Sequence, residues 1–248
     1  MNVNLEYCNP FDGNKENIWM KAEHCGRYLF ASDLISESNS APLKILDAAC
    51  ADGYGSQILS GRGRIVYGVD RSEDYLSIAR SRDCDATFIR LDFDKQSFPF
   101  SDGELDVVVC FETLEHMEYP DRLVREFSRI LRTKGTLLLS FPNAIYEKLD
   151  ENGVNKDPYH KHIFKLDDIK HILFESFEIE SVLGQFLCNQ AYAMESATIK
   201  SEVLSQEAIS SIYRYDPEAV MILSRTLAYP CASHVDESYS YIIIARKK

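Results

Sequence analysis

The sequence lacks any Cys-x-x-Cys pair and any apolar run of the roughly 18 residues that a membrane-spanning helix needs. Its seven cysteines are scattered and odd in number, which argues against a disulfide framework and against a zinc site. The first seven residues include polar residues and an acid and show no basic segment ahead of an apolar core, so no signal peptide is recognised. We therefore expect a cytoplasmic protein with reduced thiols and no membrane span.

Positive charge is also scarce, because 27 Lys and Arg residues stand against 39 Asp and Glu residues. The net charge of −12 disfavours a nucleic-acid substrate, since phosphate neutralisation needs a basic face. The basic clusters, at residues 62–64 and 246–248, are short. Hydrophobic residues make up 45% of the 248 residues. This length and composition suit one large α/β domain or one domain with an insertion.

The most informative stretch is residues 44–59. Residues 45–49 form a short apolar run after Pro42, which is typical of a strand buried on both faces. A tight turn with Gly53 and Gly55 follows and leads into a helical pattern. Such a turn brings backbone N–H groups close to a ligand, and the alternative is a turn of small residues with no ligand.

A second strand, residues 65–69, ends at Asp70. In a nucleotide-binding α/β unit, a carboxylate at this place is expected to bind a ribose. A carboxylate can accept hydrogen bonds from both hydroxyls of a vicinal diol at once. The alternative is that Asp70 belongs to a helix N-cap with Ser72 nearby.

Strand and helix patterns alternate along the chain. Strands are predicted at 45–49, 65–69, 86–90, 105–110, 135–141, 177–186 and 239–245, and helices at 18–35, 56–61, 72–82, 120–132 and 166–174. This rhythm predicts a Rossmann-like, mostly parallel seven-stranded sheet with helices on both faces. We expect one domain over residues 1–248, with an arm and a covering helix in 1–40. A helical insertion at 187–238 would serve as a lid, substrate wall or oligomer contact, or would add core helices.

The pattern Asp47-x-x-x-Ala51-x-Gly53-x-Gly55 resembles the first motif of the class I S-adenosylmethionine (SAM)-dependent methyltransferases, Asp/Glu-x-x-x-Gly-x-Gly-x-Gly. Ala51 stands where the first glycine is usual. Residues 111–116, followed by Pro120 and the 130–135 segment, resemble the methyltransferase type 11 group within that superfamily. The resemblance implies SAM as cofactor, S-adenosylhomocysteine as product and no metal.

The resemblance also implies a set of cofactor-binding residues. These are Asp47, Ala49, Ala51, Gly53, Gly55, Asp70, Arg71, Asp92, Phe93, Phe111 and Arg27. Asp92 would accept a hydrogen bond from the adenine amino group while Phe93 lines the ring; alternatively, Asp92 starts a loop as an Asx residue. Arg27 would meet the methionine carboxylate, or would form a surface ion pair with Glu23.

Three residues are candidates for catalysis. Glu112 would line the floor near the cofactor sulfur, and His116, which with Glu115 is expected to begin the following helix, could be a base or make a structural hydrogen bond. His160 lies in a loop at the mouth of the site and would accept a proton from a hydroxyl nucleophile or tether the loop to backbone carbonyls. No third ligand accompanies His160 and His162, so a metal pair there is not expected.

We therefore expect a SAM-dependent methyltransferase that acts on a small molecule or a sugar or glycan precursor. A non-catalytic SAM-binding protein is one alternative, for which Ala51 is the hint. An NAD(P)-dependent oxidoreductase is disfavoured, because Gly-x-Gly-x-x-Gly is incomplete and no Tyr-x-x-x-Lys occurs. The acceptor and a homodimer are left open.

Overall fold

Seven strands form one sheet in the computed structural model, which describes residues 8–11, 18–35, 42–61, 63–151, 155–185 and 217–248. The strands are β1 (Leu43–Ala48), β2 (Arg64–Asp70), β3 (Thr87–Arg90), β4 (Leu105–Phe111), β5 (Leu131–Pro142), β6 (Phe177–Gln185) and β7 (Ser240–Lys247). Their order across the sheet is β3-β2-β1-β4-β5-β7-β6. The first five are parallel, and β7 runs antiparallel to both β5 and β6. The expected mostly parallel seven-stranded sheet is confirmed.

The strand order reverses direction at β1, which pairs with β2 on one side and with β4 on the other. In an open α/β sheet, the crevice beyond the carboxyl ends of such strands is where ligands bind. Registry places Asp47 beside Val109, and Asp70 beside Arg90. The tips of β1, β2, β3 and β4 therefore share one edge of the sheet.

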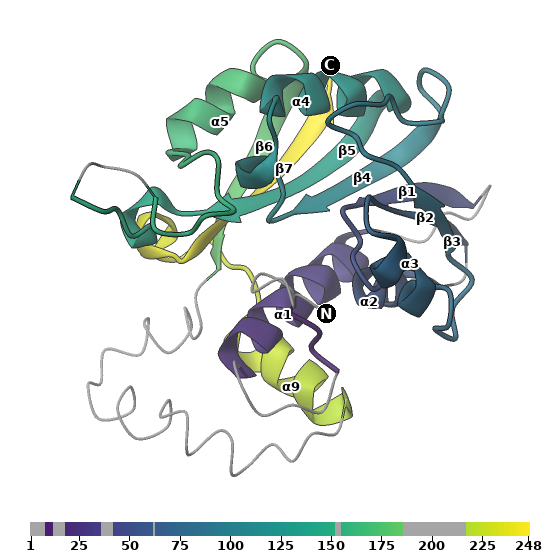
Figure 1. Ribbon diagram of the computed structural model, residues 1–248, viewed down its shortest axis with the longest axis horizontal. Helices are drawn as coiled ribbons and strands as arrows, with labels where there is room; N and C mark the ends of the chain where they lie inside the picture. The colour runs from purple at the N-terminus through teal and green to yellow at the C-terminus, as the bar shows by residue number, and fades with distance from the viewer. Residues whose placement is uncertain (1–7, 12–17, 36–41, 62, 152–154, 186–216) are drawn as a thin grey trace.

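Helices cover both faces of the sheet (Figure 1). They are α1 (Ile18–Leu34), α2 (Tyr54–Leu59), α3 (Glu73–Ala79), α4 (Pro120–Ile130), α5 (Leu166–Leu173) and α9 (Pro217–Leu227). Helix α4 buries Leu123, Val124, Phe127 and Ile130, whose spacing gives one apolar face, and with α5 it packs on one side of the sheet. Helices α1 and α2 pack on the other side through Tyr28, among others.

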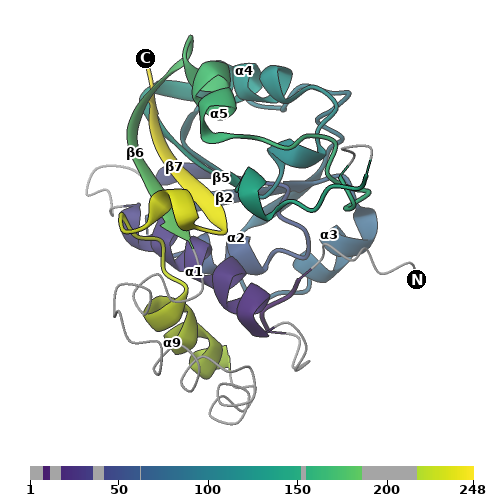
Figure 2. The ribbon, with the colours of Figure 1, turned by 90° about the vertical axis from the view of Figure 1, so that its left-hand side faces the viewer.

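Helix α9 lies along α1 rather than on the sheet, as Figures 1 and 2 both show. Val220 packs against Cys25 and Leu29 of α1, and Arg225 forms an ion pair with Asp33. The described end of the predicted 187–238 insertion is thus helical, with α9 and a 3₁₀ turn at Val235–Glu237. Residues 187–216 lie outside the described part of the chain, so the roles offered for the insertion stay predictions.

The expectation about the segment after β4 was wrong. Glu115 and His116 do not begin the helix that follows β4 but form a separate 3₁₀ turn, Leu114–His116. Pro120 is the first residue of α4, and a proline disfavours helical conformation at the residue before it. Tyr119 accordingly has φ −132° and ψ 76°, so the chain leaves the turn and restarts as a new helix.

No helix in the described ranges combines the length and the apolar character that crossing a membrane requires.

Candidate functional site

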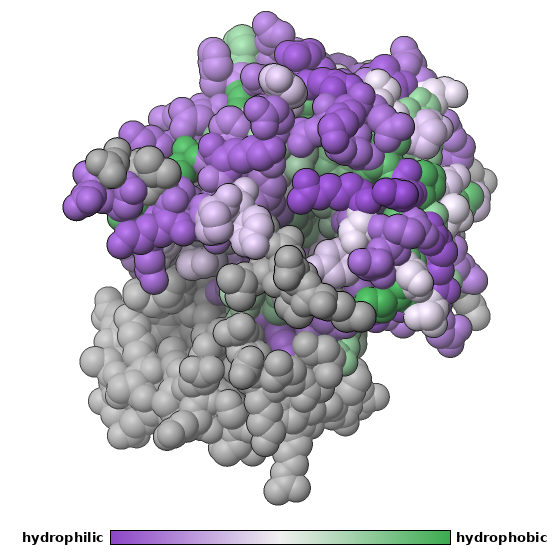
Figure 3. Space-filling view, in the orientation of Figure 1, coloured by the Kyte–Doolittle hydropathy of each residue, from purple (hydrophilic) through white to green (hydrophobic). Residues whose placement is uncertain are grey.

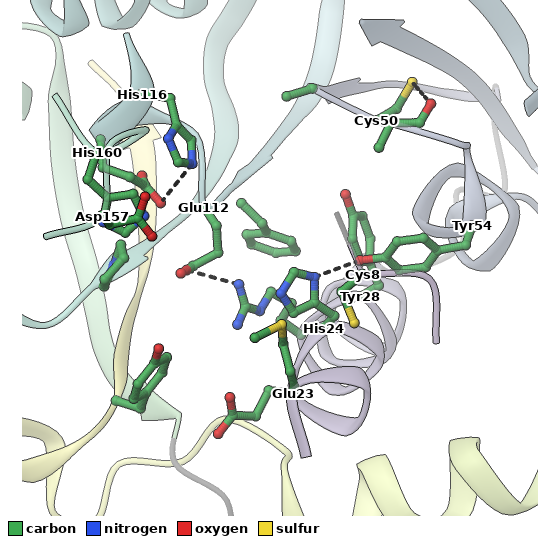
Figure 4. A pocket seen from close by; sticks show the side chains of 18 of the residues that line it. Cys8, Glu23, His24, Tyr28, Cys50, Tyr54, Glu112, His116, Asp157 and His160 are labelled. Atoms are coloured by element: carbon green, nitrogen blue, oxygen red, sulfur yellow. Dashed lines mark hydrogen bonds and ion pairs between the residues drawn. The ribbon is translucent and has the colours of Figure 1, made fainter. Parts of the chain in front are cut away.

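A cavity of about 300 Å³ lies beyond the carboxyl ends of β1 and β4. Its walls come from α1, from the turn after β1, from the segment after β4 and from the loop that carries His160 (Figure 4). In the view of Figure 3, hydrophilic residues cover much of the described surface above the grey residues. The cavity is therefore at the edge where the sheet order predicts a ligand.

Backbone strain is concentrated around this cavity. Five non-glycine residues of the described chain have positive φ, and three of them, Ala49, Ala51 and Glu112, line the cavity. Their φ values are 62°, 46° and 45°. Left-handed backbone costs an L-residue about 1–2 kcal/mol, and such strain gathers at functional sites. The strain supports a functional role for this turn and for the tip of β4.

Asp70 fixes the turn after β1 to the tip of β2. Its Oδ2 accepts the backbone N–H of Ala51 at 3.0 Å, and its Oδ1 accepts that of Ser72 at 2.8 Å. Burial raises the pKa of Asp70, although these backbone hydrogen bonds oppose the rise. The N-cap of α3 is Ser72, whose hydroxyl accepts the N–H of Tyr75. The N-cap residue is therefore Ser72 rather than Asp70, which accepts the Ser72 N–H, and the ribose role of Asp70 stays a prediction.

Asp47 supports the turn from behind the cavity wall. Its side chain is fully buried and accepts hydrogen bonds from Tyr28 Oη at 2.8 Å and from Ser56 Oγ at 2.6 Å. A Cβ on Gly55 would lie 2.2 Å from the Tyr28 ring, and a Cβ on Gly53 would lie 2.8 Å from Phe88. Asp47 and the two glycines do not line the cavity; they let the turn pack closely on its neighbours.

Arg27 does line the cavity, and it is only 2% exposed. Its Nη1 lies 2.9 Å from Glu112 Oε1, and its Nε donates to Gln185 Oε1 at 3.1 Å. Ser140 Oγ also donates to Glu112 Oε1, at 2.6 Å. The alternative of a surface ion pair with Glu23 is wrong, because the Arg27 guanidinium is buried against the strand ends.

His116 and His160 lie together at the end of the cavity away from Cys50 and Tyr54 (Figure 4), and Glu115 also lines the cavity. His160 Nδ1 is 2.9 Å from Glu147 Oε1, and His116 Nδ1 is 3.1 Å from the carbonyl oxygen of Tyr159. Burial lowers the pKa of His116 and raises that of Glu115 well above its usual range. The structural hydrogen bond predicted for His116 is therefore present, and His160 is held by a carboxylate rather than by a carbonyl.

Four further predicted residues, Asp70, Arg71, Asp92 and Phe93, do not line this cavity. Asp92 forms an ion pair with Lys95 at 2.8 Å, and Phe93 stacks on Phe98 with ring centroids 5.6 Å apart. Arg71 is exposed. The adenine-binding roles of Asp92 and Phe93 stay predictions, as does the role of Arg71.

The sequence prediction missed several cavity residues, notably His24, Tyr28 and Tyr54. His24 and Tyr28 lie four residues apart and so share a face of α1 with Arg27, a spacing that could have found them. Burial, then the charge of Arg27, lowers the pKa of His24 to about 3. The neutral His24 ring is 3.2 Å from Tyr54 Oη through Nδ1.

Comparison with known proteins shows that part of the chain is similar to methyltransferases. Residues 46–139 match the family model described as "Methyltransferase domain". A Mycobacterium tuberculosis protein named "Probable S-adenosylmethionine-dependent methyltransferase" is 31% identical over 133 residues, which are 53% of this chain and 47% of that protein. A ubiquinone biosynthesis O-methyltransferase of Glaesserella parasuis is 31% identical over 107 residues, 40% of this chain and 45% of that protein. The matches span about half the length of these relatives.

Solved structures share the fold at lower identity. The [4+2]-cyclase SpnF superposes with a TM-score of 0.60 at 17% identity, covering 96% of this chain and 86% of that one. An S-adenosylmethionine dependent methyltransferase from Mesorhizobium loti gives 0.52 at 20% identity, covering 88% and 96%. Residues 46–139 of this chain are therefore similar to a methyltransferase domain, and the solved structures share its fold.

Proposed function

We propose that this protein transfers a methyl group from SAM to a hydroxyl of a small-molecule or glycan-precursor acceptor. The observation that carries the proposal is the cavity at the reversal point of the sheet. One end of it is formed by the strained Ala49–Ala51 turn that Asp70 holds, and the other by His116 and His160.

The residues that line the cavity, together with Asp70 beside it, fit SAM. The volume of about 300 Å³ is at the lower end of the range for ligand pockets. Asp70 stands at the tip of β2, where its buried carboxylate can accept from the ribose hydroxyls. Tyr28, Tyr54 and Phe111 supply aromatic faces, which attract a cationic sulfonium. Arg27 would meet the methionine carboxylate while it keeps its bond to Glu112.

When bound, SAM supplies an electrophilic methyl group whose C–S bond breaks as the acceptor oxygen bonds to carbon, the electron pair staying on sulfur. The protein's own work is to orient the acceptor and to exclude water. It must also take up the hydroxyl proton. His160 can take a proton only at Nε2, because Nδ1 faces the Glu147 carboxylate at 2.9 Å and so carries the hydrogen.

A hydroxyl acceptor is favoured by the relatives. Several of them, from Glaesserella parasuis, Pseudomonas aeruginosa and Thiobacillus denitrificans, are named ubiquinone biosynthesis O-methyltransferase. The histidine-rich end of the cavity agrees with such an acceptor, because a hydroxyl must lose a proton and an amine with a free lone pair need not.

The test is the binding of SAM to Asp70→Asn, measured by calorimetry. We expect the dissociation constant to rise roughly ten- to hundredfold, since a hydrogen bond to a charged group is worth about 1.5–3 kcal/mol. Asp74→Asn is the matched control, because Asp74 is exposed in the first turn of α3 and should leave binding unchanged. An unchanged constant in the folded Asp70 variant would remove Asp70 from the site.

Turnover separates the remaining functions. Methyl-labelled SAM, offered with a panel of hydroxylated acceptors, should label at least one of them. Tight SAM binding without transfer to any acceptor would favour a non-catalytic SAM-binding protein. A thermal shift with NAD or NADP and none with SAM would favour the oxidoreductase, because only a true ligand stabilises the fold.

A further inference from the structure

Three side chains at the acceptor end of the cavity form a cluster to which the proposed methyl transfer assigns no joint role. Glu115, His116 and His160 each offer one ligand-capable atom, and these atoms all lie within 4.8 Å of one another. Glu115 and His116 come from the 3₁₀ turn after β4, and His160 comes from the loop before α5. The cluster therefore joins two segments far apart in sequence, and Figure 4 shows His116 and His160 side by side.

Glu115 is the unexplained member. It is 1% exposed, and neither carboxylate oxygen has a hydrogen-bond partner among the described residues. His116 Nε2 lies 3.8 Å from Oε1, which is too far for a hydrogen bond. Buried polar groups are nearly always partnered, and an unpartnered carboxylate points to an ion or water that belongs at the site.

The hydrogen bonds of His116 and His160 resemble those of metal-binding histidines. Nδ1 of His160 faces Glu147 Oε1 at 2.9 Å, and Nδ1 of His116 faces the Tyr159 carbonyl at 3.1 Å. A carbonyl or carboxylate oxygen can only accept, so each Nδ1 carries the hydrogen and the lone pair is on Nε2. Metal-ligating histidines characteristically donate their other N–H to such an acceptor, which fixes the ring.

We propose that Glu115, His116 and His160 bind one divalent transition-metal cation at the acceptor end of the cavity. Two imidazoles and one carboxylate suit Zn²⁺, Mn²⁺, Fe²⁺ or Co²⁺ better than Mg²⁺ or Ca²⁺, which prefer oxygen ligands alone. Three protein ligands leave a position open toward the cavity. This proposal departs from the expectation of no metal, which came from the family resemblance, the scattered cysteines and the lack of a third ligand beside His160 and His162.

Two neighbouring groups are not ligands. His162 Nε2 is 3.0 Å from the carbonyl oxygen of Met117 and so carries a hydrogen directed away from the cluster. Glu112 Oε1 is already engaged by Arg27 and Ser140. The proposed ligands are therefore only Glu115, His116 and His160.

The cation would bind the acceptor, an inference that rests on the proposed function. An acceptor with a hydroxyl, or with two adjacent oxygens, can occupy the open coordination position. The cation then orients the oxygen and favours loss of its proton to solvent, and the lone pair of His160 is used for coordination rather than as a base.

The test uses the full chain, treated with a chelator, dialysed and titrated with Mn²⁺, Co²⁺ or Zn²⁺. We expect one equivalent to bind by calorimetry and elemental analysis, and the Co²⁺ form to show the visible spectrum of nitrogen ligation. Glu115→Gln and His160→Asn should each weaken binding at least tenfold. His162→Asn, on the same loop but outside the cluster, should bind as the parent does.

The outcomes separate this site from the proposed function. Absence of stoichiometric binding, or undiminished binding in both cluster variants, would overturn the metal site. Circular dichroism and SAM binding verify that the variants are folded. A protein that binds no metal in the titration and still transfers a methyl group would reject the site and keep the function. Metal binding that the cluster variants abolish, in a protein that transfers no methyl group, would keep the site and reject the function.

Discussion

Arg27 of α1 and Glu112 at the tip of β4 form an ion pair, with Nη1 and Oε1 2.9 Å apart. The Arg27 side chain is 2% exposed and that of Glu112 17%. The pair joins the covering helix to the edge of the sheet where the cavity opens. Removing one partner of a buried pair leaves the other charge without compensation, so the pair should govern how firmly α1 is attached.

Arg27→Met should lower the free energy of unfolding by about 3–5 kcal/mol, because it leaves the Glu112 carboxylate buried without its cation. Glu112→Leu alone should cost a similar amount. The double variant should cost less than the sum, since neither charge then remains unpaired. Urea unfolding of the four proteins gives the coupling free energy directly.

The matched control is the ion pair between Arg225 and Asp33, which also joins α1 to another helix. Its side chains are 45% and 42% exposed, so Arg225→Met should cost less than about 1 kcal/mol. Equal losses in the free energy of unfolding for Arg27→Met and Arg225→Met would contradict the prediction that burial makes the Arg27–Glu112 pair the more stabilising of the two.

Most of the fold could be predicted because its signals are local. Apolar runs such as residues 105–110 and the amphipathic 120–130 segment fix a strand and a helix without reference to distant residues. The antiparallel partners of β7 and the packing of α9 on α1 could not be predicted this way, because both depend on contacts between distant segments.

The site was only partly predictable for the same reason. Strand-end residues such as Glu112 could be found, because the chain order places strand tips at one edge. No local sequence pattern distinguishes Glu115. Its lack of a hydrogen-bond partner and its proximity to His160, which lies in the loop before α5, are visible only in the folded chain. Asp47 was predicted to bind the cofactor, but a buried carboxylate can also hold a turn, and residue type alone does not separate the two uses.

Gly55→Ala should destabilise the protein by about 1–3 kcal/mol through overpacking. An added Cβ would lie 2.2 Å from the Tyr28 ring, so the ring must move away. Tyr28 donates to Asp47, and the displacement should therefore weaken that hydrogen bond as well. Thermal unfolding measures the loss, and tyrosine fluorescence or NMR of the ring reports the displacement.

Gly61→Ala is the matched control, because a Cβ at Gly61 meets nothing within 4 Å. It should leave the free energy of unfolding within about 0.5 kcal/mol of the parent. Equal stability of Gly55→Ala and Gly61→Ala would contradict the close packing of Tyr28 on the turn.

Asp47 should make stability depend on pH in an unusual direction. Burial raises its pKa from the usual 3.8 to about 7, although the hydrogen bonds from Ser56 and Tyr28 oppose the rise. Between these values the folded protein holds the proton more tightly than the unfolded chain does. The contribution of Asp47 to stability is therefore fully present below about pH 4 and is lost as the pH rises to 7.

Asp47→Asn removes this titration, and an amide can keep hydrogen bonds to both hydroxyls. The unfolding free energy of the variant relative to the parent should rise between pH 4 and pH 8 by up to about 4 kcal/mol, the equivalent of a shift of about three pKa units. Urea unfolding at several pH values measures this difference. Asp33→Asn is the control, because the hydrogen bond from Arg225 lowers the pKa of Asp33 from 3.8. Its effect on stability therefore changes at and below about pH 4, and the difference for Asp33→Asn should stay nearly flat between pH 5 and pH 8. A difference for Asp47→Asn that stays flat across this pH range would show that the Asp47 carboxylate is ionised in the fold throughout.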